Sequence, residues 1–108
     1  MSTDTIPVFD RDQLKRATKG DAALQVEVLV LFVAEVERLM RQVEEAEDPQ
    51  LRGDRLRALI TVARNTGAAM LAREARALET QIAAEAPALG PLRKAVAETL
   101  AYARQVGV

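Results

Sequence analysis

The chain has 108 residues, 49% of them hydrophobic, with 15 Lys and Arg against 16 Asp and Glu and no cysteine. This length suits one domain, residues 1–108, and the near-zero net charge lacks the basic excess typical of nucleic-acid-binding proteins. The absence of cysteine excludes disulfides and thiolate metal sites, and we expect neither a metal nor a cofactor. We also expect no nucleic-acid partner.

No stretch of the chain has the pattern of a leader or of a membrane-spanning segment. The first residues, Met1 to Thr5, carry neither a positive leader nor an apolar run. The longest apolar stretch, Val28 to Val36, is interrupted at Glu35 and is too short to span a bilayer. We therefore expect a cytoplasmic protein with no membrane partner, in which residues 1–8 form a flexible N-terminal segment.

Apolar residues three and four positions apart predict helices along most of the chain, and the class is all-α. Asp10 is expected to cap a short first helix that ends near Gly20, with the Gln13 side chain returning to the backbone of Asp10 in a capping box. Asp21 is expected to cap a long second helix that ends at about Glu47. The core positions of that helix are Leu29, Phe32, Val36, Leu39 and Val43.

A third helix begins either at Asp48-Pro49, which suit the cap and the first helical position, or at Asp54. The later start is considered because Gly53 weakens a helix by about 1 kcal/mol relative to alanine. With either start, one face of this helix carries Leu56, Leu59, Ala63 and Thr66. At about 100° per residue, the nearly opposite and exposed face carries Arg57, Thr61 and Arg64.

The last two helices are expected over Gly67 to Glu85 and over Leu92 to Gln105, separated by a Pro- and Gly-containing break. Their inward positions are Ala68, Leu71, Ala75, Leu78 and Ile82 in the first, and Leu92, Val96, Leu100 and Ala103 in the second. Long amphipathic helices joined by short loops predict an antiparallel up-down-up-down four-helix bundle, with the short first helix across one end.

The stretch Leu56 to Ala72, followed by Ala75 and Leu78-Glu79, resembles the core motif of histidine-containing phosphotransfer (HPt) domains from bacterial multistep phosphorelays. That motif contains approximately His-Thr-Leu-Lys-Gly-Ser-Ala, and later Gly-Ala, Leu-Ala and Leu-Glu. Counting back ten residues from Gly67 leads to Arg57 as the equivalent of the phosphorylated histidine. The resemblance implies a bacterial protein with an HPt-like bundle, whose third helix here carries the acceptor position on its exposed face.

The departures from the motif fall on the residues that carry its chemistry. The family's basic residue one turn after the histidine is Ile60 here, the glycine beside it is Thr61, and the small polar residue that follows is Val62. A guanidinium stays protonated and offers no lone pair, so Arg57 cannot accept a phosphoryl group as imidazole does. The chain has no histidine at any position. We therefore expect no phosphotransfer, no catalytic residue and no enzymatic activity.

The resemblance implies that the partner is the receiver domain of a response regulator or a histidine kinase, whose two-component signalling the chain would modulate. A receiver presents acidic residues around its phosphorylatable aspartate, and Arg57 is able to pair with carboxylates there. The alternative is that Arg57 is an ordinary exposed arginine. Ile60 offers either an apolar contact to the partner or burial under a neighbouring helix. The expected contact residues are Arg57, Ile60, Thr61 and Arg64.

A second apolar stripe on the second helix is formed by Val26, Val30 and Val33. Its expected role is to be covered by the N-terminal region through Ile6, Val8, Phe9 and Leu14, and the other interpretation is additional docking surface. Bundles also serve structural roles, and fold alone does not fix function. The competing hypothesis is therefore a structural or self-associating bundle with no receiver partner, although we expect a monomer.

Overall fold

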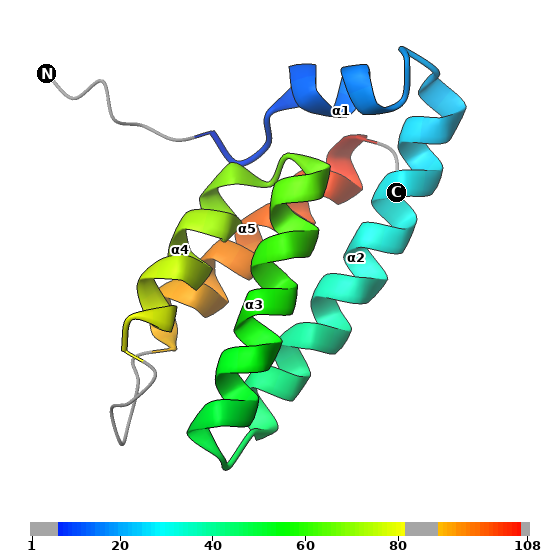
Figure 1. Ribbon diagram of the computed structural model, residues 1–108. Coiled ribbons are helices and arrows are strands. Elements are labelled where there is room, and N and C mark those ends of the chain that lie inside the picture. The colour runs from blue at the N-terminus through cyan, green and yellow to red at the C-terminus, as the bar shows by residue number, and fades with distance from the viewer. Residues whose placement is uncertain (1–6, 82–88, 107–108) are drawn as a thin grey trace, which may run out of the picture.

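The computed structural model describes residues 7–81 and 89–106, and it is helical with no strand within them (Figure 1). The all-α prediction is confirmed. The helices are α1 (Arg11–Ala17), α2 (Ala22–Glu45), α3 (Pro49–Thr66), α4 (Ala69–Glu79) and α5 (Gly90–Val106). Across these residues, no helix combines the length and the apolarity needed to cross a membrane.

The long helices lie alongside one another and alternate in direction, while α1 crosses the end at which α3 turns into α4 (Figure 1). Helix α3 packs against both α2 and α4, and α5 packs against α4 and α2. Helix α3 thus lies between α2 and α4 and presents its outer side there.

The predicted caps of the first two helices are confirmed. The side chains of Asp10 and Asp21 accept hydrogen bonds from the backbone N–H groups of Gln13 and Leu24, each at 3.1 Å. The other half of the expected capping box is wrong, because Gln13 Nε2 donates to the carbonyl of Arg64 at 2.5 Å. The last-turn carbonyls of a helix lack intrahelical donors, and Gln13 supplies one to α3.

Helix α3 begins at Pro49, the earlier of the two predicted starts. The Asp48 side chain accepts the backbone N–H of Gln50 at 2.9 Å, and Gly53 lies buried within the helix. Helix α2 ends at Glu45, earlier than predicted. The turn between these helices is tied by the Arg52 guanidinium, which donates to a carbonyl at the end of α2 at 2.6 Å.

Helix α4 ends at Glu79. The prediction that it continues to Glu85 is therefore wrong for the described residues that directly follow Glu79. The Thr80 hydroxyl donates to the carbonyl of Ala77 at 2.7 Å, and this side-chain bond competes with continuation of the helix. Ile82 and the remainder of the predicted extension lie outside the described residues. Helix α5 begins at Gly90, before the predicted start, because Pro91 fits the first turn of a helix.

The predicted core is confirmed at every inward position that the structure describes except Thr66, which is only partly buried. The N-terminal segment also contributes. The ring of Phe9 packs edge-on against Phe32 at a centroid distance of 5.3 Å and stacks on Tyr102 at 5.2 Å. Val8, within the segment expected to be flexible, is half-buried and packs against the same core, and residues 1–6 lie outside the described residues.

The turn from α3 to α4 depends on Gly67. Its φ is 95°, in the left-handed region, and its carbonyl accepts the backbone N–H of Asp10 at 2.7 Å. A Cβ added at Gly67 would lie 2.9 Å from the carbonyl oxygen of Asp10. Position 67 therefore requires glycine for its backbone conformation and also for the close approach of the segment before α1.

We predict that Leu59→Ala lowers the free energy of unfolding by about 2 to 5 kcal/mol, because Leu59 is fully buried in the core. Arg57→Ala should change it by no more than about 1 kcal/mol, because the Arg57 side chain is 64% exposed. Chemical denaturation of both variants measures the difference. The reverse order would contradict the rotational phase of α3 and the surface position of Arg57.

We also predict that Gly67→Ala destabilises the protein more than Gly20→Ala. Both glycines have positive φ, so each substitution introduces left-handed strain of about 1 to 2 kcal/mol. Only at Gly67 does the new Cβ meet a close backbone atom, since nothing lies within 4 Å of the corresponding position at Gly20. Equal losses in urea denaturation would mean that the approach of Asp10 to Gly67 is not tight in solution.

Candidate functional site

The outer side of α3 carries Arg57, Thr61 and Arg64, and we call these residues the α3 ridge. All three are exposed, as the sequence predicts. The side chains follow one another by about one helical turn, so they form a continuous strip between α2 and α4. The ridge is therefore accessible to a partner.

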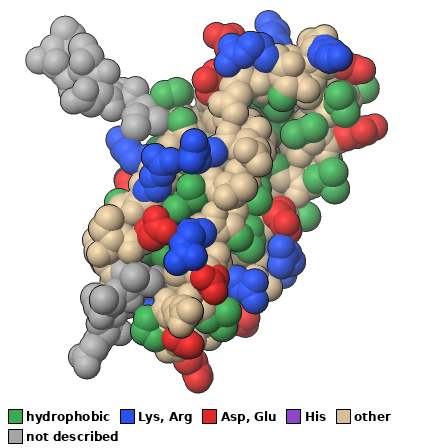
Figure 2. Space-filling model, viewed as in Figure 1, with side chains coloured by type: hydrophobic (Ala, Val, Ile, Leu, Met, Phe, Trp, Pro, Cys, Tyr) green, Lys and Arg blue, Asp and Glu red, His purple; other side chains and the backbone are tan. Residues whose placement is uncertain are grey.

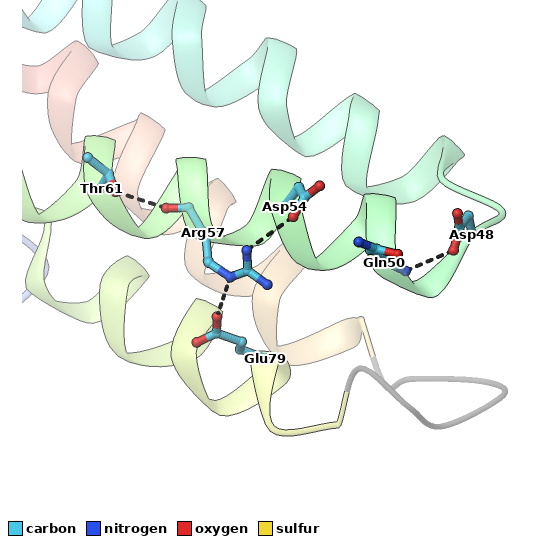
Figure 3. Close-up of polar contacts among 6 residues, drawn as sticks. All are labelled: Asp48, Gln50, Asp54, Arg57, Thr61 and Glu79. Carbon is cyan, nitrogen blue, oxygen red and sulfur yellow. Dashed lines mark hydrogen bonds and ion pairs between the residues drawn. The ribbon is translucent and has the colours of Figure 1, made fainter.

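The Arg57 guanidinium is held between two carboxylates (Figure 3). Its Nη1 lies 3.1 Å from Oδ1 of Asp54, one turn earlier on α3, and its Nε lies 3.3 Å from Oε2 of Glu79 on α4. The Arg57 cation, expected to pair with a partner's carboxylates, is thus already paired within the molecule. The spacing of Asp54 and Arg57 is a signal that sequence reasoning could have used, whereas Glu79 belongs to another helix.

No side chain of the ridge is arranged as a phosphoacceptor. The Thr61 hydroxyl donates to the backbone carbonyl of Arg57 at 3.0 Å, which is an ordinary bond between neighbouring helical turns. The Arg57 guanidinium has donors only and no lone pair. In the described part of the chain, no group of three or more Asp or Glu side chains gathers in a way that could hold a metal ion.

Ile60 is buried, with 7% of its surface exposed, so it cannot act as the apolar contact residue considered from the sequence. It lies next to the core residue Leu59, on the flank of α3 from which Arg57 reaches across to α4. That flank is closed because α3 and α4 pack tightly. Of the two sequence interpretations, burial under a neighbouring helix is the correct one.

The valine stripe on α2 does not act as one surface. Val33 is buried, Val26 is half-buried, and Val30 is 47% exposed. Val33 therefore belongs to the core and is excluded from docking, and Val30 is not covered by the described part of the N-terminal region. The aromatic ring of that region packs on Phe32 and Tyr102 instead, while Ile6, also expected as cover, lies outside the described residues.

Sequence reasoning missed the large apolar side chain with the greatest exposure among those described. Leu31 on α2 is 71% exposed. Figure 2 shows hydrophobic side chains at the surface along α2. A signal was present, because Val28 to Val33 is an uninterrupted apolar run and covers a helix on all sides. At least one member of such a run must face outward when only one side is buried.

Leu31 borders a groove between α2 and α3, with a volume of about 550 Å³, which we call the α2–α3 groove. Its lining is formed by Val28, Leu31, Phe32, Ala34, Glu35, Arg38, Val62, Asn65 and Thr66. The groove adjoins the α3 ridge, because Val62 and Asn65 lie beside Thr61 and Arg64 on the same helix. An apolar depression thus lies next to the charged ridge.

The charges at the edge of this groove largely cancel. Arg38 donates from Nε to Oε1 of Glu35 at 2.8 Å. This hydrogen bond lowers the pKa of the Glu35 carboxyl below its ordinary value, and the same bond raises the pKa of Arg38. The pair remains charged around neutral pH, and the groove presents apolar surface with a locally balanced rim.

A second depression lies where α1 meets the turn between α3 and α4, and we call it the α1–α4 cleft. Its volume is about 540 Å³, and it is lined by Asp10, Gln13, Ala63, Arg64, Gly67, Ala69, Ala72, Arg73 and Arg76. Figure 2 shows Lys and Arg side chains gathered over the beginning of α4. The sequence alone could not show that Arg73 and Arg76 of α4 line the same cleft as Arg64 of α3, because this depends on how the two helices pack.

Comparison of the chain with family models, curated proteins and solved structures finds no match. Three surfaces of the described residues are suited to recognition: the α3 ridge, the α2–α3 groove and the α1–α4 cleft. The ridge and the groove adjoin along α3, while the cleft begins at Arg64, the last residue of the ridge.

Proposed function

We propose that the chain is a non-catalytic HPt-like domain that binds a receiver domain of a response regulator, or a histidine kinase, and modulates signalling without phosphotransfer. The proposal includes the HPt-like form of the fold, an antiparallel up-down-up-down four-helix bundle with α1 across one end. One observation carries it. Arg57 occupies an exposed position on α3 where the resembling family has its phosphoacceptor, in a chain without histidine.

The docking surface in this proposal consists of the α3 ridge and the α2–α3 groove. Leu31 takes the apolar role that the sequence suggested for Ile60, because it is 71% exposed and lies at the groove. Arg57 and Arg64 provide positive charge beside it. Protein interfaces commonly combine an apolar centre with a polar rim, and these two adjoining surfaces supply both.

Asp54 and Glu79 compete with any acidic partner for Arg57. The carboxylates of an acidic receiver pocket must replace Asp54 and Glu79 as the partners of Arg57. Asp54 and Glu79 are then left unpaired, and their negative charges repel the acidic pocket. Exposed ion pairs contribute only about 0 to 1 kcal/mol, so the exchange is feasible. The affinity of the complex should therefore increase when Glu79 loses its charge and decrease when Arg57 is reversed.

A second candidate function, self-association without a receiver partner, is favoured by the apolar exposure of α2. Leu24, Val30 and Leu31 are 40%, 47% and 71% exposed on this one helix. Exposed apolar side chains can form contact sites between proteins, and Leu24 and Leu31, seven residues apart, lie on the same face of this helix. The two candidates differ in whether Arg57 affects the interaction, since none of these α2 side chains belongs to the ridge.

We predict no phosphorylation when the protein is mixed with an active histidine kinase and labelled ATP, or with a phosphorylated receiver. Arg57→His should also fail to become labelled efficiently, because Ile60 supplies no positive charge near the phosphoryl group and Thr61 replaces the small glycine of the motif. The measurement is acid-labile label on the protein, with a histidine-bearing HPt domain as positive control. Rapid labelling of Arg57→His would show that the remaining site is intact.

We predict that Arg57→Glu weakens binding of a cognate receiver and that Glu79→Gln strengthens it. Lys94→Glu, on α5, is the matched control for charge reversal and should leave affinity unchanged. The wild-type complex should also weaken as salt rises, since exposed charges are screened over about 10 Å at 0.1 M.

The measurement is calorimetric titration of each variant at two salt concentrations, accompanied by sizing of the isolated protein. Equal affinities for all variants would exclude the ridge as the interface. A concentration-dependent dimer without receiver binding would favour self-association instead.

A further inference from the structure

We propose that the α1–α4 cleft binds a small, non-aromatic phosphate monoester. Three arginines line the cleft, Arg64 from α3 and Arg73 and Arg76 from α4, together with one acidic residue, Asp10. Its volume of about 540 Å³ falls within the range of about 300 to 1,000 Å³ typical of small-molecule sites. This inference does not rest on the proposed function: the two surfaces share Arg64, but Arg73 and Arg76 lie outside the α3 ridge.

The positive charge in the cleft is poorly compensated by the protein. Among the described residues, Arg64 and Arg76 form no ion pair, and the only carboxylate near Arg73 is that of Glu74, at 3.7 Å. The Asp10 carboxylate already accepts a hydrogen bond from the backbone N–H of Gln13. Like charges gathered at one depression repel each other, and an anion placed among them relieves that repulsion.

The walls of the cleft are fixed by contacts that do not involve a ligand. The backbone N–H of Asp10 donates to the Gly67 carbonyl at 2.7 Å, and Gln13 Nε2 donates to the Arg64 carbonyl at 2.5 Å. These bonds hold α1 against the end of α3 and so define one side of the depression. A site whose backbone is already ordered loses less entropy when it binds a ligand.

The chemistry of the lining selects the class of ligand. Arginine presents a planar fork of donors that matches the oxygens of phosphate, often with two parallel hydrogen bonds. The lining contains three arginines and one carboxylate, and this excess of positive charge favours a dianion such as a phosphate monoester over a monoanion, even with Glu74 beside Arg73. The other lining residues are Gln13, Gly67 and small alanines, with no aromatic ring on which a nucleotide base could stack.

The test is titration of the ¹⁵N-labelled protein with glycerol 3-phosphate, inorganic phosphate and adenosine monophosphate at constant ionic strength set with chloride. We expect amide shifts confined to the cleft-lining residues of α1, α3 and α4, and saturation with glycerol 3-phosphate. Arg76→Gln and Arg73→Gln should each weaken binding about tenfold, as loss of a charge-assisted hydrogen bond does. Arg41→Gln on α2, which removes the same charge elsewhere, should change affinity by less than about twofold.

The use of two cleft variants keeps the test valid if one of them fails to fold, which circular dichroism would reveal. Equal weakening by Arg41→Gln and by the cleft variants would overturn the proposal, because it would indicate a response to overall charge. Absence of saturable shifts in the cleft would also overturn it. Tighter binding of adenosine monophosphate than of glycerol 3-phosphate would refute the non-aromatic class of ligand. Binding of inorganic phosphate alone would refute the monoester.

Discussion

The hydrogen bond from the Asp10 backbone to the Gly67 carbonyl ties three helices together at one peptide unit. Gly67 adopts a left-handed conformation, and the carbonyl of Ala63 accepts the backbone N–H groups of both Gly67 and Ala68, which ends α3. The same turn directs the chain into α4, and Asp10 caps α1 from the other side. The α1–α4 cleft exists because these elements meet there, and the α3 ridge ends there. The α1–α4 cleft and the end of the α3 ridge therefore depend on a conformation that only glycine supplies at low cost.

The pairing of Arg57 changes what its exposure means. A solitary exposed cation would attract any acidic surface, whereas a guanidinium between Asp54 and Glu79 belongs to a cluster with excess negative charge. Under the proposed function, recognition through Arg57 requires exchange of its partners, and specificity would come from the need for an acidic group whose geometry lets it replace both carboxylates. Such exchange conserves the number of ion pairs. The apolar surface at Leu31 is then needed to provide net affinity, since it can be removed from water without displacing an existing partner.

Local signals in the sequence predicted the helices and their inward faces well. Aspartates at 10, 21 and 48 act as caps because each satisfies a backbone N–H within its own turn, and such contacts are set by neighbours in sequence. Positions on the flanks of a helix were harder to predict. Ile60 and Val33 are buried because a neighbouring helix covers them, and Leu31 is exposed because none does. Periodicity along a single helix does not specify where its neighbours lie. The same limit applies to the candidate surfaces, since the pairing of Glu79 with Arg57 and the lining of one cleft by Arg64 and Arg73 depend on how α4 is placed against α3.

The two proposed binding events share one side chain. Arg64 ends the α3 ridge and also lines the α1–α4 cleft, so an anion held in the cleft reduces the positive charge that the ridge offers to an acidic partner. Linkage requires the effect to be reciprocal, with the partner lowering the affinity for the anion by the same factor. Arg57 lies on the ridge but does not line the cleft, and Arg76 lines the cleft but does not belong to the ridge. Substitutions at these two arginines therefore separate the events, whereas a substitution at Arg64 alters both and cannot assign an effect to either.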